Sequence, residues 1–280
     1  MDEVKVKVDQ TDGSEPEDME KSEFSYFRVQ SYWGATKHMG GFKATQTLLQ
    51  MCHIEPGKRV LEIGCGAGMT SWRLAKEYGC FVVGIDLSEE MIAWSKKRAE
   101  REGVTEQTEF RVANAEKLPF EDYEFDLVFC ESVTAFPEDK QRAVKEYARV
   151  AKSGGYVGMN EGTWINHPPP ADLAEYIRNT MENAVFLNQE GWENLLVEAG
   201  LGDIQSVIYE LSILDQWKNQ MGGLSSGDKR ETWKAFGSFL SLYLRDPDFR
   251  KYARKITPSR STLRQFFKYV GYGLYAGRKV

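Results

Sequence analysis

The sequence has no long apolar run and few residues of the kinds that bind metals. None of its 280 residues falls in a stretch near the roughly 18 to 20 apolar residues of a membrane-spanning helix. The amino terminus has neither the basic start nor the apolar stretch of a signal peptide. The chain contains 3 histidines and 4 cysteines, and the cysteines show no metal-ligand spacing. We therefore expect a cytoplasmic protein with reduced thiols, without a membrane span or a bound metal.

Charge is distributed unevenly along the chain. The net charge is −6, yet residues 1–22 hold eight acidic residues against three lysines, whereas residues 212–269 hold twelve Lys or Arg against five acidic residues. The overall acidity disfavours nucleic acid as a partner, although the basic segment keeps that possibility open. No internal repeat is evident, and a hydrophobic share of 41% is enough for a packed core.

A glycine-rich turn is the most informative motif. Residues 60–68 read Val-Leu-Glu-Ile-Gly-Cys-Gly-Ala-Gly, and an apolar run ends at Asp86, 18 residues after Gly68. A chain that turns sharply from a strand into a helix needs positive φ and a backbone that a ligand can approach, which glycine allows. Asp86 is predicted at the carboxyl end of the next strand, where a carboxylate can accept both ribose hydroxyls. The spacing therefore predicts a nucleotide-type cofactor.

Two details decide between cofactors. A dinucleotide fingerprint has its third glycine three residues after the second, but position 69 is Met69. Glu62 stands just before the turn, where an acidic side chain suits a ligand with a cationic end better than a pyrophosphate. S-adenosylmethionine carries an ammonium and a sulfonium, so both details favour it over NAD.

Several motifs occur in an order that resembles class I S-adenosylmethionine-dependent methyltransferases, over roughly residues 40–162. They are residues 60–68, Asp86, residues 114–120 (Asn-Ala-Glu-Lys-Leu-Pro-Phe) and residues 125–128. Residues 40–45 are similar to the small-molecule branch, which includes phosphoethanolamine, sarcosine and tocopherol-type methyltransferases. Many family members have Asp where this chain has Asn114, whose amide oxygen can still meet the adenine amino group.

The resemblance implies roles for individual residues. The glycines would surround the methionyl part of the cofactor, Asp86 would bind the ribose, Leu87 and Met91 would pack on the adenine, and Asn114 and Ala115 would lie at its edge. The predicted cofactor-binding set is Glu62, Gly64, Cys65, Gly66, Gly68, Asp86, Leu87, Met91, Asn114, Ala115, Glu116 and Glu131.

Strand-like and helix-like segments alternate from residue 59 to residue 160. We predict strands at 59–63, 81–85, 108–112, 125–130 and 156–160, and helices at 68–78, 89–102 and 138–152, the last ending at Gly154-Gly155. This alternation predicts a doubly wound, mostly parallel α/β sheet, and the resemblance implies a Rossmann-like sheet of seven strands with the last antiparallel.

The pattern changes after residue 162. Helices are predicted from 168 to about 186 and over 190–199, and strands over 204–211 and 272–278. About 55 residues separate these last two strands. Within them we predict a helix from Ser226 to Leu244 and further helices that start at Asp246-Pro247 and Thr257-Pro258. We divide the chain into an acidic tail (1–22), an N-terminal lid (23–56), a core (57–211 and 270–280) with a small helical insertion (163–187), and a helical cap (212–269).

Candidates for contact with the methyl acceptor lie at strand ends and in the lid. Glu131 ends the predicted fourth strand and could bind the donor's ammonium, bind a cationic acceptor or act as a base, or it could simply be a solvated or helix-capping carboxylate. His38 could reach the acceptor from the lid, although a lone histidine more often packs or lies on the surface. The predicted catalytic residues are Glu131 and His38. The predicted substrate-pocket residues are Tyr26, Tyr32, Trp33, Asn160, Glu161 and His167.

The sequence predicts a methyltransferase that acts on nitrogen, oxygen or carbon of a small organic acceptor. Residues 130–133 read Cys-Glu-Ser-Val, unlike the Asn-Pro-Pro-Tyr type of motif with which amino-methylating DNA enzymes hold a flipped base. Two alternatives remain: an NAD(P)-dependent oxidoreductase, and a relative that binds S-adenosylmethionine without catalysis. The apolar face of the cap must be buried, either over a pocket or in a homodimer.

Overall fold

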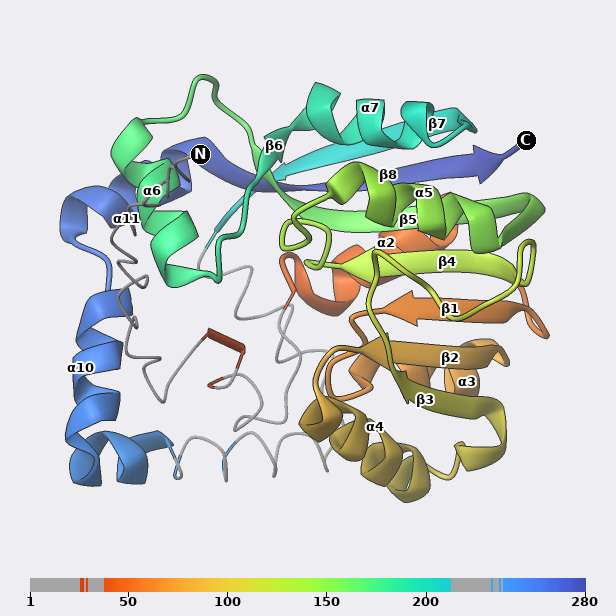
Figure 1. The fold of residues 1–280 in the computed structure, drawn as a ribbon, viewed down its shortest axis with the longest axis horizontal. Coiled ribbons are helices and arrows are strands. Elements are labelled where there is room, and N and C mark those ends of the chain that lie inside the picture. Colours follow the sequence, from red (N-terminus) through yellow and green to blue (C-terminus); the bar gives the residue numbers. More distant parts are fainter. Residues whose placement is uncertain (1–25, 28, 30–37, 213–232, 234–236, 238) are drawn as a thin grey trace, which may run out of the picture.

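The structure is a computed structural model that describes residues 26–27, 29, 38–212, 233, 237 and 239–280 (Figure 1). The predicted acidic tail and parts of the predicted lid and cap lie outside these residues. The strands are β1 (Arg59–Ile63), β2 (Phe81–Asp86), β3 (Thr108–Val112), β4 (Phe125–Glu131), β5 (Ala151–Trp164), β6 (Leu187–Asn188), β7 (Leu201–Glu210) and β8 (Val270–Lys279). The helices are α2 (Gly41–Met51), α3 (Met69–Tyr78), α4 (Glu89–Glu102), η1 (Thr105–Gln107), α5 (Lys140–Val150), α6 (Ala171–Thr180), α7 (Gln189–Glu198), α10 (Pro247–Ile256) and α11 (Arg260–Tyr269).

The strands form one mixed sheet in the order β3-β2-β1-β4-β5-β8-β7, with the short β6 paired to β5. The pairs from β3 to β5 are parallel, whereas β8 is antiparallel to both β5 and β7. The order reverses at β1, where the chain moves from one half of the sheet to the other, and ligands bind at such switch points in open α/β sheets. The predicted doubly wound fold with an antiparallel last strand is confirmed, although the short β6 makes eight strands in the described part of the chain, where seven were predicted.

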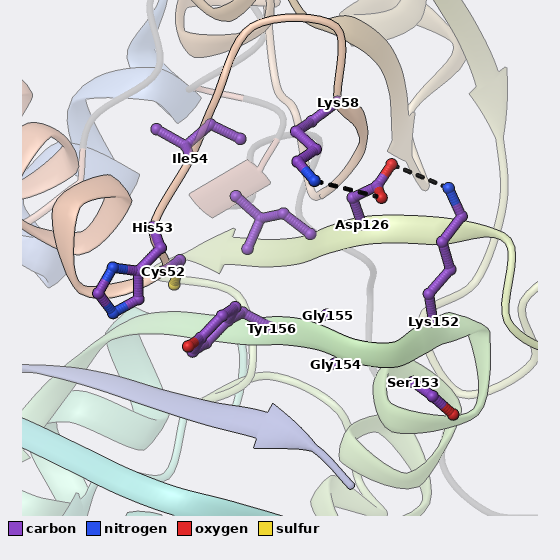
Figure 2. A pocket seen from close by; sticks show the side chains of 11 residues that line it. Cys52, His53, Ile54, Lys58, Asp126, Lys152, Ser153, Gly154, Gly155 and Tyr156 are labelled. Carbon is purple, nitrogen blue, oxygen red and sulfur yellow. Dashed lines mark hydrogen bonds and ion pairs between the residues drawn. The ribbon is translucent and has the colours of Figure 1, made fainter.

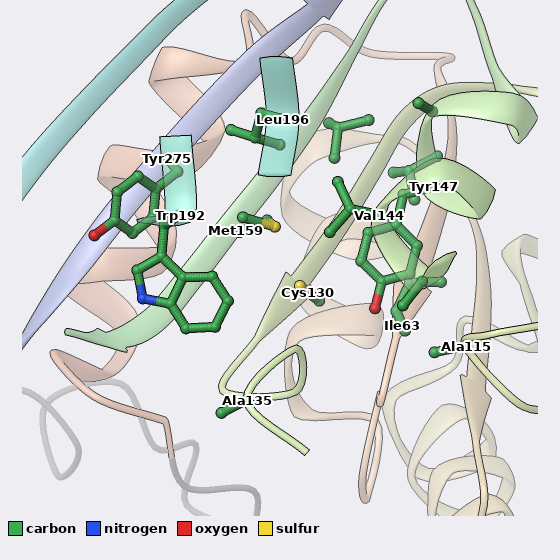
Figure 3. Close-up of a cluster of buried hydrophobic side chains, with 14 of the residues drawn as sticks. Ile63, Ala115, Cys130, Ala135, Val144, Tyr147, Met159, Trp192, Leu196 and Tyr275 are labelled. Atoms are coloured by element: carbon green, nitrogen blue, oxygen red, sulfur yellow. The ribbon is translucent and has the colours of Figure 1, made fainter. Parts of the chain in front are cut away.

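Helices cover both faces of the sheet. Successive residues of its central strands point to opposite faces, so both sets of side chains are buried. Val60 packs into the core on the face covered by α2, α3 and α4, whereas Leu61 packs into the core beneath α5 and α7. Figure 3 shows part of the second core, in which Trp192 of α7 lies near Met159 and Tyr275. The Trp192 indole donates to the carbonyl of Gly162 at 3.1 Å, so its polar atom is paired although the side chain is buried.

Helix α5 is shorter than predicted and β5 is longer. The helix ends at Val150 and the strand begins at once, so Gly154 and Gly155 lie inside β5 and the prediction that they end a helix was wrong. They occur where the pairing register with β4 shifts between Phe125 and Leu127. Gly154 has φ 78, and a Cβ on Gly155 would come within 2.7 Å of a backbone oxygen, so this irregular segment requires glycine.

Side chains cap the starts of several helices. Ser88 accepts a hydrogen bond from the backbone N–H of Met91 at the start of α4, and Asp246 caps α10 with proline in its first turn. The helix expected at Thr257-Pro258 begins later, because Ser259 provides the cap of α11. The helix expected over 168–186 is also shorter than predicted, since α6 ends at Thr180. The start of the predicted helix before α10 lies outside the described residues.

The helices α10 and α11 lie on the side toward which the arrows of β1, β2 and β4 point (Figure 1). The Tyr176 hydroxyl of α6 donates to the carbonyl of Ile256 at the end of α10, at 2.6 Å. Part of the predicted cap therefore lies beyond the carboxyl ends of the parallel strands. In the described part of the chain, no helix has the length and apolarity required to cross a bilayer.

Candidate functional site

The carboxyl ends of the central strands meet at one edge of the sheet. β1 pairs in parallel with both β2 and β4, and its last residue, Ile63, is in register with Ile85 and Cys130, each one residue before the end of its strand. The turn that begins at Gly64 and the carboxylates of Asp86 and Glu131 therefore lie at the same edge. Asn160 of β5 is the register partner of Glu131. Four of the predicted site residues thus come from four adjacent strands.

Asp86 is held by backbone N–H groups on both of its oxygens. Gly66 donates to Oδ2 and Ser88 donates to Oδ1, each at 2.9 Å. Partial burial raises the pKa of Asp86, and the backbone donors of Ser88 and Gly66 counteract part of that rise. Each carboxylate oxygen retains acceptor capacity, so Asp86 can still accept two ligand hydroxyls.

The glycine turn lies tightly against its neighbours. Gly64 has φ 64, and a Cβ there would overlap the side chain of Val133. Gly68 has φ 71, caps α3, and would bring a Cβ within 3.0 Å of Ser95. Cys65 is fully buried and its N–H donates to the carbonyl of Ile85 at 2.8 Å, so this residue fixes the turn to β2. The turn therefore requires glycine at positions 64 and 68.

Glu62 lies beneath the turn and is buried. Its carboxylate accepts a hydrogen bond from the Ser71 hydroxyl of α3. Burial raises the pKa of Glu62 to about 8, the Ser71 hydroxyl lowers it, and the charges of Glu131 and Asp86 raise it further. A buried carboxyl with so high a pKa is a group on which the charge of a nearby ligand would act strongly.

Glu131 is the centre of a buried hydrogen-bond network. The Thr45 hydroxyl of α2 donates to its Oε1 at 2.8 Å, and the Thr70 hydroxyl of α3 donates to its Oε2 at 3.1 Å. His38 Nε2 lies 3.0 Å from the Thr45 hydroxyl and 3.5 Å from Glu131 Oε1. The structure therefore brings both predicted catalytic residues together.

The two threonines of this network were not predicted from the sequence. Thr45 is fully buried on the face of α2 that also carries Ala44 and Leu48. A polar side chain on the apolar stripe of an amphipathic helix is the signal that could have found it. Thr70 carries no comparable signal, because it stands directly after the glycine turn.

Most residues predicted near the adenine closely follow β2 or β3, whereas Met91 lies in the first turn of α4. Leu87 is 70% exposed although it is apolar, whereas Met91 and Ala115 are buried in or beside the core. Asn114 accepts a hydrogen bond from the N–H of Glu116 at 2.9 Å, which forms the turn after β3. The Glu116 carboxylate in turn accepts from the N–H of Asp139 at 2.9 Å. Of these residues, Leu87 offers the largest exposed apolar surface for stacking against a base.

The predicted acceptor-side residues do not form one cluster. The Asn160 amide donates to the carbonyl of Met39 at 2.9 Å. The fully buried Glu161 accepts from the N–H groups of Val133 and Thr134 at 3.1 and 2.7 Å, and burial raises the pKa of its carboxyl. Glu161 therefore fastens the segment after β4 to β5.

The remaining acceptor-side candidates lie elsewhere. The N–H of Tyr26 donates to Glu182 at 3.0 Å, and its ring lies 5.9 Å from that of Phe136. His167 is exposed in the segment after β5. Tyr32 and Trp33 lie outside the described residues. The role of each as a pocket residue stays a prediction.

A separate hollow of about 190 Å³ lies at the opposite edge of the sheet (Figure 2). Asp126 at the start of β4 accepts from the Lys152 ammonium at 2.9 Å and lies 4.0 Å from that of Lys58. Burial raises the pKa of Asp126, but the Arg59 N–H and the Lys152 ammonium outweigh burial, so the pKa is lowered overall. The Asp126 carboxylate is therefore paired with two lysines of the hollow.

The described residues contain no group of three or more His, Cys, Asp or Glu placed to hold a metal ion. All four cysteines are buried. Burial raises the pKa of the Cys52 thiol to about 12, so this group is a thiol rather than a metal-binding thiolate near neutral pH.

Comparisons with known proteins agree on one kind of domain. Residues 61–159 match the family described as "Methyltransferase domain". An uncharacterised protein of Haemophilus influenzae is 33% identical over 177 residues, which cover 62% of this chain and 70% of that protein. Phosphoethanolamine N-methyltransferase 1 of Arabidopsis thaliana is 28% identical over 59% of this chain, and the match spans only 33% of that longer protein.

A solved structure has the same fold over nearly the whole chain. It is a SAM-dependent methyltransferase from Thiobacillus denitrificans in complex with S-adenosyl-L-homocysteine, and it superposes with a TM-score of 0.68 at 20% identity. The superposition covers 92% of this chain and 99% of that one.

Proposed function

Because the chain belongs to the class I S-adenosylmethionine-dependent methyltransferase family, we propose that it transfers a methyl group to nitrogen, oxygen or carbon of a small organic acceptor and releases S-adenosylhomocysteine. Family membership confirms the predicted cofactor, S-adenosylmethionine. The observation that carries the proposal is the position of Asp86 beside the glycine turn, with acceptor capacity left on both carboxylate oxygens.

The residues at the carboxyl edge fit this cofactor. Asp86 would accept the two ribose hydroxyls, and Leu87 would pack on the adenine, which would cover an exposed apolar side chain. The backbone from Gly64 to Gly68 would lie along the methionyl part, and a Cβ at Gly64 or Gly68 would meet a neighbouring side chain. Glu62 provides a buried acidic group beneath the cationic end of the cofactor.

The chemistry requires mainly positioning and exclusion of water. When bound, S-adenosylmethionine supplies an electrophilic methyl group on a sulfonium. The protein must hold the acceptor's lone pair in line with that methyl group at near-attack distance. We assign this task to residues at the ends of β4 and β5 together with the helices α10 and α11, which lie beyond the same edge. Tyr26, Asn160, Glu161 and His167 remain candidates for contact with the acceptor.

The most direct test uses methyl-labelled S-adenosylmethionine and fractionated small-molecule extracts. We expect label to appear in a small-molecule fraction together with S-adenosylhomocysteine. Label found only in polymer fractions would contradict the proposed acceptor class. Binding of the donor without product in any fraction would instead support a non-catalytic relative.

A thermal-shift comparison separates the cofactors. We expect S-adenosylmethionine to raise the melting temperature more than NAD or NADP does. A larger shift with a nicotinamide cofactor would favour an oxidoreductase. A homodimer formed through residues 212–269 and a cytoplasmic location remain parts of the proposal, and light scattering of the purified chain tests the first.

A further inference from the structure

The hydrogen-bond network around Glu131 determines which nitrogen of His38 carries a proton. A carboxylate can only accept hydrogen bonds, and a threonine hydroxyl has one proton to donate. Because the Thr45 hydroxyl donates that proton to Glu131 at 2.8 Å, it must accept in its contact with His38 Nε2 at 3.0 Å. A neutral His38 ring therefore carries its proton on Nε2.

The other ring nitrogen is then a free base. His38 Nδ1 is buried and has no hydrogen-bond partner in the described part of the chain. The side chain is 10% exposed, so the ring is largely shielded from bulk water. Burying a polar atom without a partner costs free energy, which is recovered when a ligand supplies the missing donor.

The network lies at the edge that we assign to methyl transfer. Glu131 is the last residue of β4, in parallel register with the strand that leads into the glycine turn. Thr70, in the first turn of the helix that follows those glycines, donates to the second oxygen of Glu131. The network is thus fastened to both α2 and α3, and it joins His38 to the predicted cofactor site.

We propose that His38 Nδ1 is the general base that accepts a proton from the methyl acceptor, and that Thr45 is a positioning residue that fixes the ring tautomer. This inference rests on the proposed methyltransferase function. The acceptor's lone pair forms the new bond to the methyl carbon while the carbon–sulfur bond breaks with its electron pair on sulfur. The acceptor's proton moves to Nδ1 and gives an imidazolium, which later loses a proton to water.

This assignment restricts the class of acceptor. A base is needed only when the nucleophile arrives protonated. The acceptor is therefore a hydroxyl compound or a protonated amine, whose proton must leave the attacking atom, rather than a nucleophile that arrives deprotonated. The imidazolium formed in the step would lie 3.5 Å from the carboxylate of Glu131, which stabilises the positive charge.

Polar groups from two elements contact His38, and a third element contacts its neighbour Met39. Thr45 approaches from α2, and the Glu131 carboxylate approaches from β4. Asn160 of β5 donates to the carbonyl of Met39, the residue next to His38, and is uncharged. Glu62 is the next carboxyl group and interacts with Glu131 through its charge.

The tautomer can be tested on the full-length protein without any acceptor. With ¹⁵N-labelled histidine, the ring signals of His38 are identified by their loss in His38→Gln. We expect the neutral ring to show the Nε2–H tautomer in the wild type and in Thr45→Ser, which retains the hydroxyl. In Thr45→Val this preference should weaken because no hydroxyl remains. An Nδ1–H tautomer in the wild type would overturn the proposal.

The catalytic role is tested with methyl-labelled S-adenosylmethionine and the extract fraction that yields labelled product. We expect His38→Gln to lower kcat by about 10²- to 10⁴-fold, the usual contribution of a general base, while the donor's Kd changes less than about twofold. Thr45→Val should lower kcat more than it raises KM, and Thr45→Ser should restore most of kcat. The control is His53→Gln, because His53 is exposed at the opposite edge of the sheet.

The possible outcomes separate this inference from the proposed function. Wild-type kcat in His38→Gln would overturn the role of His38 while leaving methyl transfer intact. If the wild type itself yields no product with any fraction, the proposed function fails. An Nε2–H tautomer would then show how the ring is held in a binding site, without a catalytic role. Loss of donor binding in His38→Gln would also count against a base and indicate a structural role.

Discussion

Glu62 should make the free energy of unfolding depend on pH, and a single substitution at this position should remove that dependence. Glu62→Gln replaces the buried carboxyl with a neutral side chain of the same shape that can still accept from Ser71. Burial raises the pKa of Glu62 from 4.5 to about 8 in the folded protein. Between these values the folded state holds a proton that the unfolded state has lost.

The sign and size of the effect follow from this difference. A raised pKa contributes stability that is fully present below pH 4.5 and is lost as the pH rises toward about 8. The slope reaches about 1.4 kcal/mol per pH unit, so the loss has an upper bound of about 5 kcal/mol. The glutamine variant does not titrate here, and groups common to both proteins largely cancel. Relative to the wild type, the variant should therefore gain stability as the pH rises.

Urea unfolding followed by circular dichroism, repeated from about pH 5 to pH 8, measures this difference directly. The matched control is Glu106→Gln, which makes the same chemical change at an exposed position and should give a difference that is small and independent of pH. A difference for Glu62→Gln that stays flat, or that falls as the pH rises, would refute the argument.

Other predictions concern the cofactor edge. Asp86→Ala should weaken S-adenosylmethionine binding by about 2 kcal/mol or more, because two hydrogen bonds to a charged group are lost; an unchanged Kd by calorimetry would contradict the ribose assignment. Gly64→Ala should lower both the melting temperature and the donor affinity more than Gly57→Ala does, since both glycines have positive φ but only a Cβ at position 64 overlaps a neighbour, Val133. Donor binding near pH 7 should release up to about one proton as the cation lowers the pKa of Glu62; equal binding enthalpies in buffers of different ionisation enthalpy would exclude this.

The core of the fold could be predicted from the sequence because its signals are local. The apolar runs predicted the bounds of β1 and β2 to within one residue of the structure. The glycines that end α3 and α4 did the same for these helices. Gly154 and Gly155 misled the prediction, because the same residue type ends helices and allows bulges in strands. Only the partner strand decides between these uses, and its register is not a local property.

The site was predictable only in part, for the same reason. Asp86 follows from its distance to the glycine turn along the chain. The network of Thr45, Glu131 and His38 joins residues that are up to 93 positions apart, and threonine has no pattern of its own. Their proximity depends on how α2 packs against the sheet, and no local pattern in the sequence shows that packing.

The position of β8 has a consequence for how the chain is made. This strand lies between β5 and β7, yet residues 211–269 must be synthesised after β7 before β8 begins. Until then, a nascent chain on the ribosome has two strands with unpaired edges, and loop closure over such a distance is slow. Exposed edges of this kind invite pairing with other chains. Assistance from a chaperone during synthesis should therefore matter more for this protein than the regularity of its central sheet suggests.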